Sequence, residues 1–141
     1  MIRRGPVQQS LFAGVIAPDL IASTPHIVRL DEGLEITALL RGPDWARNLG
    51  IVCASEASLA DVRRQLRHNL QARLPNAQVV LFRFYDPRVW VPYIENCEPS
   101  ALPGWFGAIT DYWTPHQGQT LRYRLQEGQL MRQALQPAST A

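Results

Sequence analysis

The sequence predicts an α/β fold, with a small mixed sheet built around a βαβ unit, and three observations support this prediction. Residues 49–54 and 78–85 are short apolar runs of the kind that form buried strands. Between them, residues 58–74 repeat leucine or valine at three- and four-residue spacing, which is the period of one helix face. A strand, a helix and a second strand in this order are typical of two parallel strands joined by a right-handed crossover.

The length of 141 residues predicts a single domain over residues 1–141, in which residues 1–9 and 136–141 show no periodicity and are expected to be loose. Apolar residues make up 46% of the chain, a normal share for a globular protein that argues against wholesale disorder. The apolar runs are far shorter than the roughly 18 residues that span a bilayer. The first residues do not lead into a signal-peptide core, so a cytoplasmic protein is expected.

The chain that precedes the βαβ unit is divided into short elements by proline and glycine. Pro25 opens a strand-like run, and Gly42-Pro43 ends a helical pattern. No internal repeat and no second domain are evident in this stretch or elsewhere. The predicted elements are a helix over Pro18–Ser23, a strand over His26–Leu30 and a helix over Glu32–Leu40.

The helix predicted over residues 58–74 has its own start and stop signals. Ser58, followed three residues later by Asp61, resembles a capping box with aspartate in place of the usual glutamate. Pro75 then stops the helix. A net charge of +2 is too small to indicate nucleic-acid binding, and we expect the basic cluster on this helix to be a solvated face. That cluster consists of Arg63, Arg64, Arg67 and Arg73.

After Pro87 the pattern becomes helical and is interrupted by further prolines. A short C-terminal part made of helices and strands is therefore expected. Its predicted elements are helices over Val89–Asn96 and Ser100–Phe106, followed by strands over Ile109–Trp113 and Gln119–Leu125 around the turn sequence TPHQG.

Cysteine and histidine give no sign of a metal or redox site. Cys53 and Cys97 are the only cysteines and lack a paired spacing, so two free thiols are expected in a cytosolic protein. The three histidines stand singly, without the spacing of metal ligands. We therefore expect neither a metal nor a cofactor.

The stretch RFYDPR, residues 83–88, ends the most apolar predicted strand with charged residues. Pro87 fixes φ and lacks an N–H, so it suits the first position of a helix and makes Asp86 the natural N-cap, worth about 0.5–2 kcal/mol. Arg83 shares its predicted strand face with Val79 and Leu81, and a buried arginine needs a partner. Asp86 is within reach if the turn swings it back.

An alternative role for the same residues is catalysis. Asp86 would act as a general base, and Arg83 and Arg88 would bind an anion at the end of a strand in a small α/β enzyme. However, no second carboxylate, nucleophile motif or glycine-rich phosphate loop stands close in the sequence. A D-P-R turn is more often a structural corner, so we expect no catalytic residues and no enzymatic activity.

Six aromatic residues follow this stretch within 24 positions. One interpretation is that they form the core of the C-terminal half. The other is that two or three of them are exposed in a contact patch, because protein interfaces favour aromatic side chains. The sequence leaves both interpretations open. The residues are Trp90, Tyr93, Trp105, Phe106, Tyr112 and Trp113.

The block LFRFYDPRV, preceded by the leucine-striped helix and followed by WFGAITDYW, resembles the adaptor, or effector-chaperone, family of bacterial type VI secretion systems. Upstream, SLFAG, STPHIVRL and GIVCAS stand in the order typical of that family, so the resemblance covers residues 10 to 113 approximately. The resemblance implies two sets of signature residues, with a structural or partner-binding role. The first is Arg83, Phe84, Tyr85, Asp86, Pro87 and Arg88, and the second is Trp105, Phe106 and Gly107.

This resemblance implies a non-enzymatic function in the cytosol. Proteins of the family bind a toxic effector and deliver it to the VgrG spike, or to its PAAR tip, before the system fires. The expected partners are therefore proteins, with no nucleic acid and no membrane insertion, and a homodimer is a further possibility.

The chain departs from the family pattern at both ends. Longer relatives begin with an additional strand and helix before the SLFAG element, and many carry a larger C-terminal region. If the additional strand is missing here, one sheet edge is expected to be open and able to accept a strand from a partner. The alternatives are that residues 1–9 or the C-terminal strands cover this edge, or that the chain dimerises through it.

Overall fold

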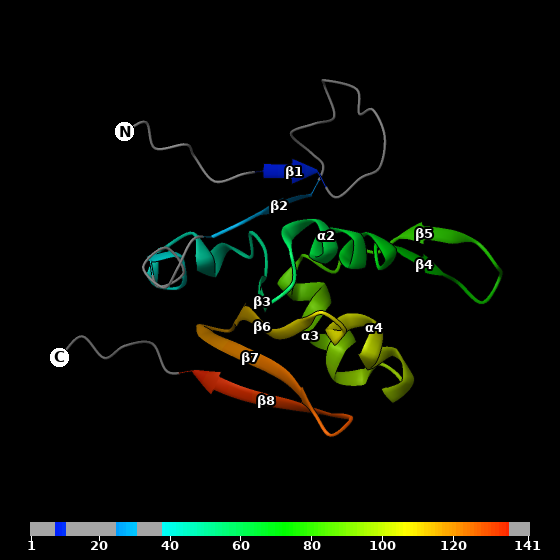
Figure 1. Ribbon diagram of the computed structural model, residues 1–141. Helices are drawn as coiled ribbons and strands as arrows, with labels where there is room; N and C mark the ends of the chain where they lie inside the picture. The colour runs from blue at the N-terminus through cyan, green and yellow to red at the C-terminus, as the bar shows by residue number, and fades with distance from the viewer. Residues whose placement is uncertain (1–7, 11–24, 31–37, 136–141) are drawn as a thin grey trace.

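The computed structural model describes residues 8–10, 25–30 and 38–135, and the structural statements that follow concern these residues (Figure 1). Helices and strands are both abundant, which confirms the predicted class of mixed helix and strand. The strands are β1 (Gln8–Ser10), β2 (His26–Val28), β3 (Val52–Ser55), β4 (Gln71–Arg73), β5 (Val79–Leu81), β6 (Ile109–His116), β7 (Gln119–Gln126) and β8 (Gln129–Leu135). The helices are α2 (Leu59–His68), α3 (Pro87–Asn96) and α4 (Leu102–Phe106), with short 3-10 helices η2 (Trp45–Arg47) and η3 (Pro99–Ala101).

The main sheet is antiparallel, with strands in the order β3-β6-β7-β8. Its last three strands form a meander joined by two-residue turns, Gln117-Gly118 and Glu127-Gly128. All four turn residues have φ between 50° and 78°, which is the conformation of a type I′ turn and matches the twist of the flanking strands. The meander is therefore specified locally, by turn chemistry and by strand alternation.

One face of the main sheet packs against the helices to form the core. Tyr112 and Tyr123 lie opposite each other on β6 and β7 and are fully buried. The Tyr123 hydroxyl donates to Glu95 Oε1 on α3 at 2.8 Å, and the Tyr112 hydroxyl donates to the Trp105 carbonyl oxygen on α4. α2 adds Val62 to the same cluster. Hydrogen bonds as well as apolar burial thus hold α3 and α4 on the sheet.

The predicted βαβ unit is wrong. β3 pairs with β6 rather than with β5, and this pairing is antiparallel. α2 ends at His68, six residues earlier than predicted, and the chain then enters β4, which forms a separate antiparallel hairpin with β5 (Figure 1). No parallel strand pair and no right-handed crossover are present in the described part of the chain.

The misassignment has its cause in the spacing of two leucines. Leu70 and Leu74 are four residues apart. This spacing places them on one face of a helix, but it also places them on one face of a strand, where every second side chain points the same way. In the structure Leu70 is buried, whereas Leu74 is exposed and its N–H donates to the Gln78 carbonyl at the hairpin turn. Arg73 consequently lies on β4 and not on the helix with the other clustered arginines.

Other predicted elements are confirmed with shifted bounds. The Ser58 hydroxyl accepts the Asp61 N–H at 3.1 Å, as the capping box predicts. The strand predicted over residues 49–54 is β3, and Leu49 lies outside it. The remaining C-terminal predictions correspond to α3, α4, β6 and β7, the strand predicted over His26–Leu30 corresponds to β2, and residues 38–41 are helical before the break at Gly42. β8 was not predicted.

The N-terminal predictions are tested only in part. The helix predicted over Pro18–Ser23 lies outside the described residues, as do residues 1–7 and 136–141. Gln8 and Gln9, expected to be loose, belong to β1, which pairs with β2. Among the residues described, no helix is long and apolar enough to cross a membrane.

Candidate functional site

The first signature stretch, residues 83–88, forms a tight corner between β5 and α3. The Asp86 N–H donates to the Arg83 carbonyl oxygen at 3.1 Å, which closes a turn. Phe84 is almost completely buried, and its ring lies 5.1 Å from that of Trp105 and 5.7 Å from that of Tyr85. The corner is therefore anchored in the core by its aromatic residues.

Asp86 caps α3, as the sequence predicts. Its Oδ1 accepts the Arg88 N–H at 2.9 Å, and its two carboxylate oxygens accept the Arg88 Nε and Nη2 at 3.0 and 2.8 Å. Pro87 occupies the first helical position and is buried. The hydrogen bond from the Arg88 side chain is the main reason why the pKa of Asp86 is lowered, against the opposing effect of burial. The carboxylate is therefore charged, engaged on both oxygens and a weak base.

Arg83 is not the buried residue that strand alternation predicts. β5 ends at Leu81, so the chain has left the strand before residue 83, and the Arg83 side chain is exposed. No described residue forms a hydrogen bond or an ion pair with its guanidinium. The positive charge of Arg83 is the smallest of the causes that lower the pKa of Asp86. Of the two signature arginines, Arg88 completes the corner, whereas the Arg83 side chain is exposed.

Substitution of Asp86 by alanine is expected to lower the free energy of unfolding by about 1–2 kcal/mol, because the helix loses its N-cap. Chemical denaturation of the wild type and of Asp86→Ala and Asp86→Asn measures this loss. Asp44→Ala is a control, since Asp44 makes no side-chain cap hydrogen bond and its ion pair with Arg47 is exposed. Unchanged stability in Asp86→Ala combined with lost partner binding would contradict the structural role.

The second signature block places its aromatic residues in the core. Trp105 is only 3% exposed, and its Nε1 donates to the Tyr93 hydroxyl at 3.0 Å. Phe106 packs edge-on against Tyr112, with the ring centroids 5.2 Å apart. The core interpretation of the six aromatic residues is thus confirmed for Trp90, Trp105, Phe106 and Tyr112, which are buried, whereas Tyr93 and Trp113 are half-buried.

A side chain that sequence analysis missed lies close to Gly107. Gln65 reaches from α2 to the end of α4, where its Nε2 donates to the Trp105 carbonyl at 3.1 Å and its Oε1 accepts the Ala108 N–H at 2.9 Å. A Cβ added at Gly107 would meet the Gln65 amide at 3.0 Å. Because Gln65 and Gly107 are 42 positions apart, only the folded chain reveals that they are neighbours.

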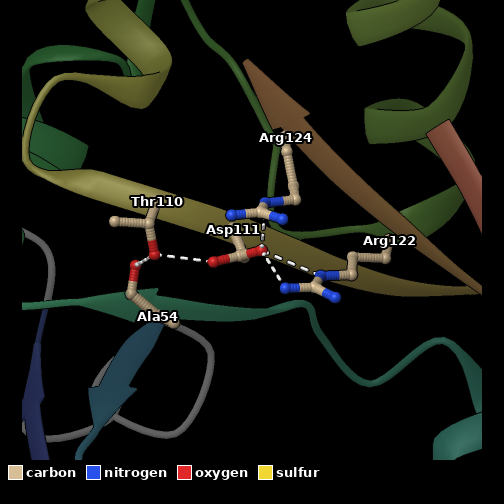
Figure 2. A network of polar contacts seen from close by, with 5 residues as sticks. All are labelled: Ala54, Thr110, Asp111, Arg122 and Arg124. Atoms are coloured by element: carbon tan, nitrogen blue, oxygen red, sulfur yellow. Dashed lines mark hydrogen bonds and ion pairs between the residues drawn. The ribbon is translucent and has the colours of Figure 1, made fainter. Parts of the chain in front are cut away.

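A buried carboxylate on the main sheet was also missed (Figure 2). Asp111 on β6 is 6% exposed and accepts hydrogen bonds from the Thr110 hydroxyl at 2.6 Å and from the Arg122 Nε at 2.8 Å. Arg124, its cross-strand neighbour on β7, places Nε 3.1 Å from the same carboxylate. Burial raises the pKa of Asp111, but these hydrogen bonds and the two positive charges outweigh burial, so the net shift is downward.

An open groove lies beside the corner, between α3 and the turn that joins β6 to β7. It has a volume of about 580 Å³, and its lining includes Arg88, Val91, Glu95, Pro115 and His116. The described residues contain no cluster of three or more potential metal ligands, in this groove or elsewhere. Both cysteines are free, and burial raises the pKa of the Cys53 thiol to about 11, so this thiol is not an activated nucleophile.

The comparisons with known proteins identify a family. A family model described as a domain of unknown function (DUF4123) matches residues 2–103, more than two thirds of the chain. The match includes the corner at residues 83–88 and ends before Trp105. Neither a search of curated proteins nor a search of solved structures gave a match. The extent of the family match shows that the chain belongs to the DUF4123 family.

Proposed function

We propose that this protein is a cytoplasmic adaptor, or chaperone, that binds a type VI secretion effector and helps to load it onto the VgrG/PAAR spike. The observation that carries the proposal is the RFYDPR corner, which resembles the signature of that adaptor family and lies within the DUF4123 match. In this proposal the partners are the effector and a spike component. Neither nucleic acid nor membrane insertion is involved.

The geometry of the corner favours binding over catalysis. Both oxygens of Asp86 are engaged by Arg88, and its lowered pKa disfavours proton abstraction near neutral pH. Phe84 and Pro87 are buried and fix the backbone. The signature residues therefore suit a rigid scaffold that displays neighbouring surfaces to another protein, and under this proposal they perform no chemistry.

Co-expression with a type VI effector and a spike protein of the same organism is expected to give a stable complex that survives size-exclusion chromatography. An effector from an unrelated secretion cluster serves as the specificity control. Absence of a complex with the cognate effector and with the spike would contradict the proposal. A reproducible hydrolytic activity that Asp86→Asn abolishes would instead support the small enzyme with an anion site around Arg83, Asp86 and Arg88.

A further inference from the structure

The β4–β5 hairpin, residues 71–81, projects from the end of α2 (Figure 1). Its base is anchored where the Phe82 N–H donates to the carbonyl of buried Leu70 at 2.6 Å. Beyond this anchor the two strands form a sheet of their own, so each has one edge without a neighbouring strand in the described part of the chain. Isolated two-stranded hairpins are only marginally stable in water, which makes this hairpin a candidate for an additional contact.

The hairpin carries most of the large exposed apolar side chains among the described residues. Val79 and Leu81, which share one face of β5, are each 50% exposed, and Leu74 beside the turn is 40% exposed. These are three of the five large apolar side chains that are exposed among the described residues; the others are Leu49 and Met131. Val79 lies opposite Arg73 in the register, so Val79 and Leu81 are neighbours on one face while Leu74 lies on the other. Neighbouring exposed apolar side chains commonly mark a protein–protein contact.

The sequence on both sides of the hairpin is rich in arginine, between Asp61 and Asp86. Residues 62–85 contain five arginines and no aspartate or glutamate. Arg67 lies in the last turn of α2, where the hairpin begins, and Arg83 lies two residues beyond β5. Neither side chain forms an ion pair with another described residue, whereas Arg64, further from the hairpin, is paired with Asp61 at 3.3 Å. A partner that covers the apolar face can therefore place carboxylates beside unpaired guanidinium groups.

We infer that the β4–β5 hairpin is the docking surface for an extended segment of the effector that alternates apolar and acidic residues. The segment adds a strand to the free edge of β5, places its apolar side chains on Val79 and Leu81, and directs a carboxylate to Arg83. Main-chain hydrogen bonds supply affinity in such strand addition, while side chains supply specificity. This inference rests on the proposed function, because it assigns a surface to the effector.

The decisive experiment compares the affinity of purified variants for the purified cognate effector. Val79→Glu and Leu81→Glu are each expected to weaken binding at least tenfold, because a carboxylate would be buried against an acidic and apolar segment. Met131→Glu is the matched control: Met131 is 47% exposed but lies on β8, so its substitution is expected to leave the affinity within twofold of wild type.

Two further measurements test the charge and the strand pairing separately. Arg83→Gln is expected to weaken binding and to reduce its salt dependence, whereas Arg47→Gln, an exposed arginine on η2, is expected to do neither. Hydrogen exchange at the amides of Val79 and Leu81 is expected to slow when the effector binds, whereas the Phe82 N–H is already bonded to the Leu70 carbonyl. Melting temperatures close to that of the wild type confirm that the exposed substitutions leave the fold intact.

The outcomes separate this inference from the proposed function. Wild-type binding that Val79→Glu and Leu81→Glu leave unchanged would overturn the hairpin surface while the adaptor function stands. Failure of the wild type to bind either the effector or the spike would overturn both. A dimer of this chain alone that Leu81→Glu dissociates would assign the surface to a second copy and so overturn the inference.

Discussion

Replacement of Trp105 by alanine is expected to lower the free energy of unfolding by about 3–5 kcal/mol, the range typical of a large aromatic residue removed from a core. Trp105 lies at the centre of the aromatic cluster, with its ring 5.2 Å from that of Trp90 and 5.5 Å from that of Tyr93. The substitution leaves a cavity and removes the donor to the Tyr93 hydroxyl. Chemical denaturation followed by circular dichroism measures the loss.

Two control variants show whether the loss comes from burial at this position. Trp113→Ala removes the same side chain from a half-buried position on β6, and a smaller loss is expected. Trp105→Phe retains most of the apolar volume and is expected to fall between the wild type and Trp105→Ala. A loss below about 1 kcal/mol for Trp105→Ala would show that the residue does not contribute a packed core contact.

Asp111→Ala is expected to destabilise the protein by about 2–3 kcal/mol, since Arg122 and Arg124 then face each other without their shared carboxylate. The loss is smaller than for a fully buried ion pair because Arg124 is 58% exposed. Asp44→Ala is the control, as Asp44 forms a single exposed pair with Arg47 at 3.7 Å and is expected to matter little. Equal losses in the two variants would contradict the role of the Asp111 network.

The same network predicts a pH dependence of stability. The pKa of Asp111 is lower in the folded protein than its usual value of 3.8, so the folded state favours the ionised carboxylate. Its contribution is fully present above the unfolded pKa and is lost as the pH falls through the lower folded value. Unfolding free energies of the wild type and Asp111→Asn should therefore differ at pH 6, and the difference should begin to narrow only as the pH falls below about 4.

The sequence predicted best those features that depend on neighbouring residues. Asp86 and Pro87 are adjacent, and their N-cap geometry follows from the chemistry of each residue. The same holds for Ser58 with Asp61, three positions apart. Local features of this kind can be recognised in the sequence without knowledge of the fold.

Features that depend on distant residues could not be predicted. Whether Leu70 and Leu74 belong to a helix or to a strand depends on which of them is buried in the core, because their spacing fits both structures equally well. Gln65 acts on residues about 40 positions away, and the environment of Asp111 is created by the register of β6 against β7. A buried aspartate cannot be recognised until the strand that supplies its arginines is in place.

The antiparallel pairing of β3 with β6 has a consequence for the order in which the chain acquires its structure. Ser55 lies opposite Ile109, so this pair closes a loop of more than 50 residues, whereas the meander from β6 to β8 closes only two-residue turns. Closing short loops costs less conformational entropy, so the meander is expected to form early and β3 to join it late. During synthesis β3 therefore cannot pair until β6 has left the ribosome. The family match ends at residue 103, before β6 begins, so the matched residues do not include the strand with which β3 pairs.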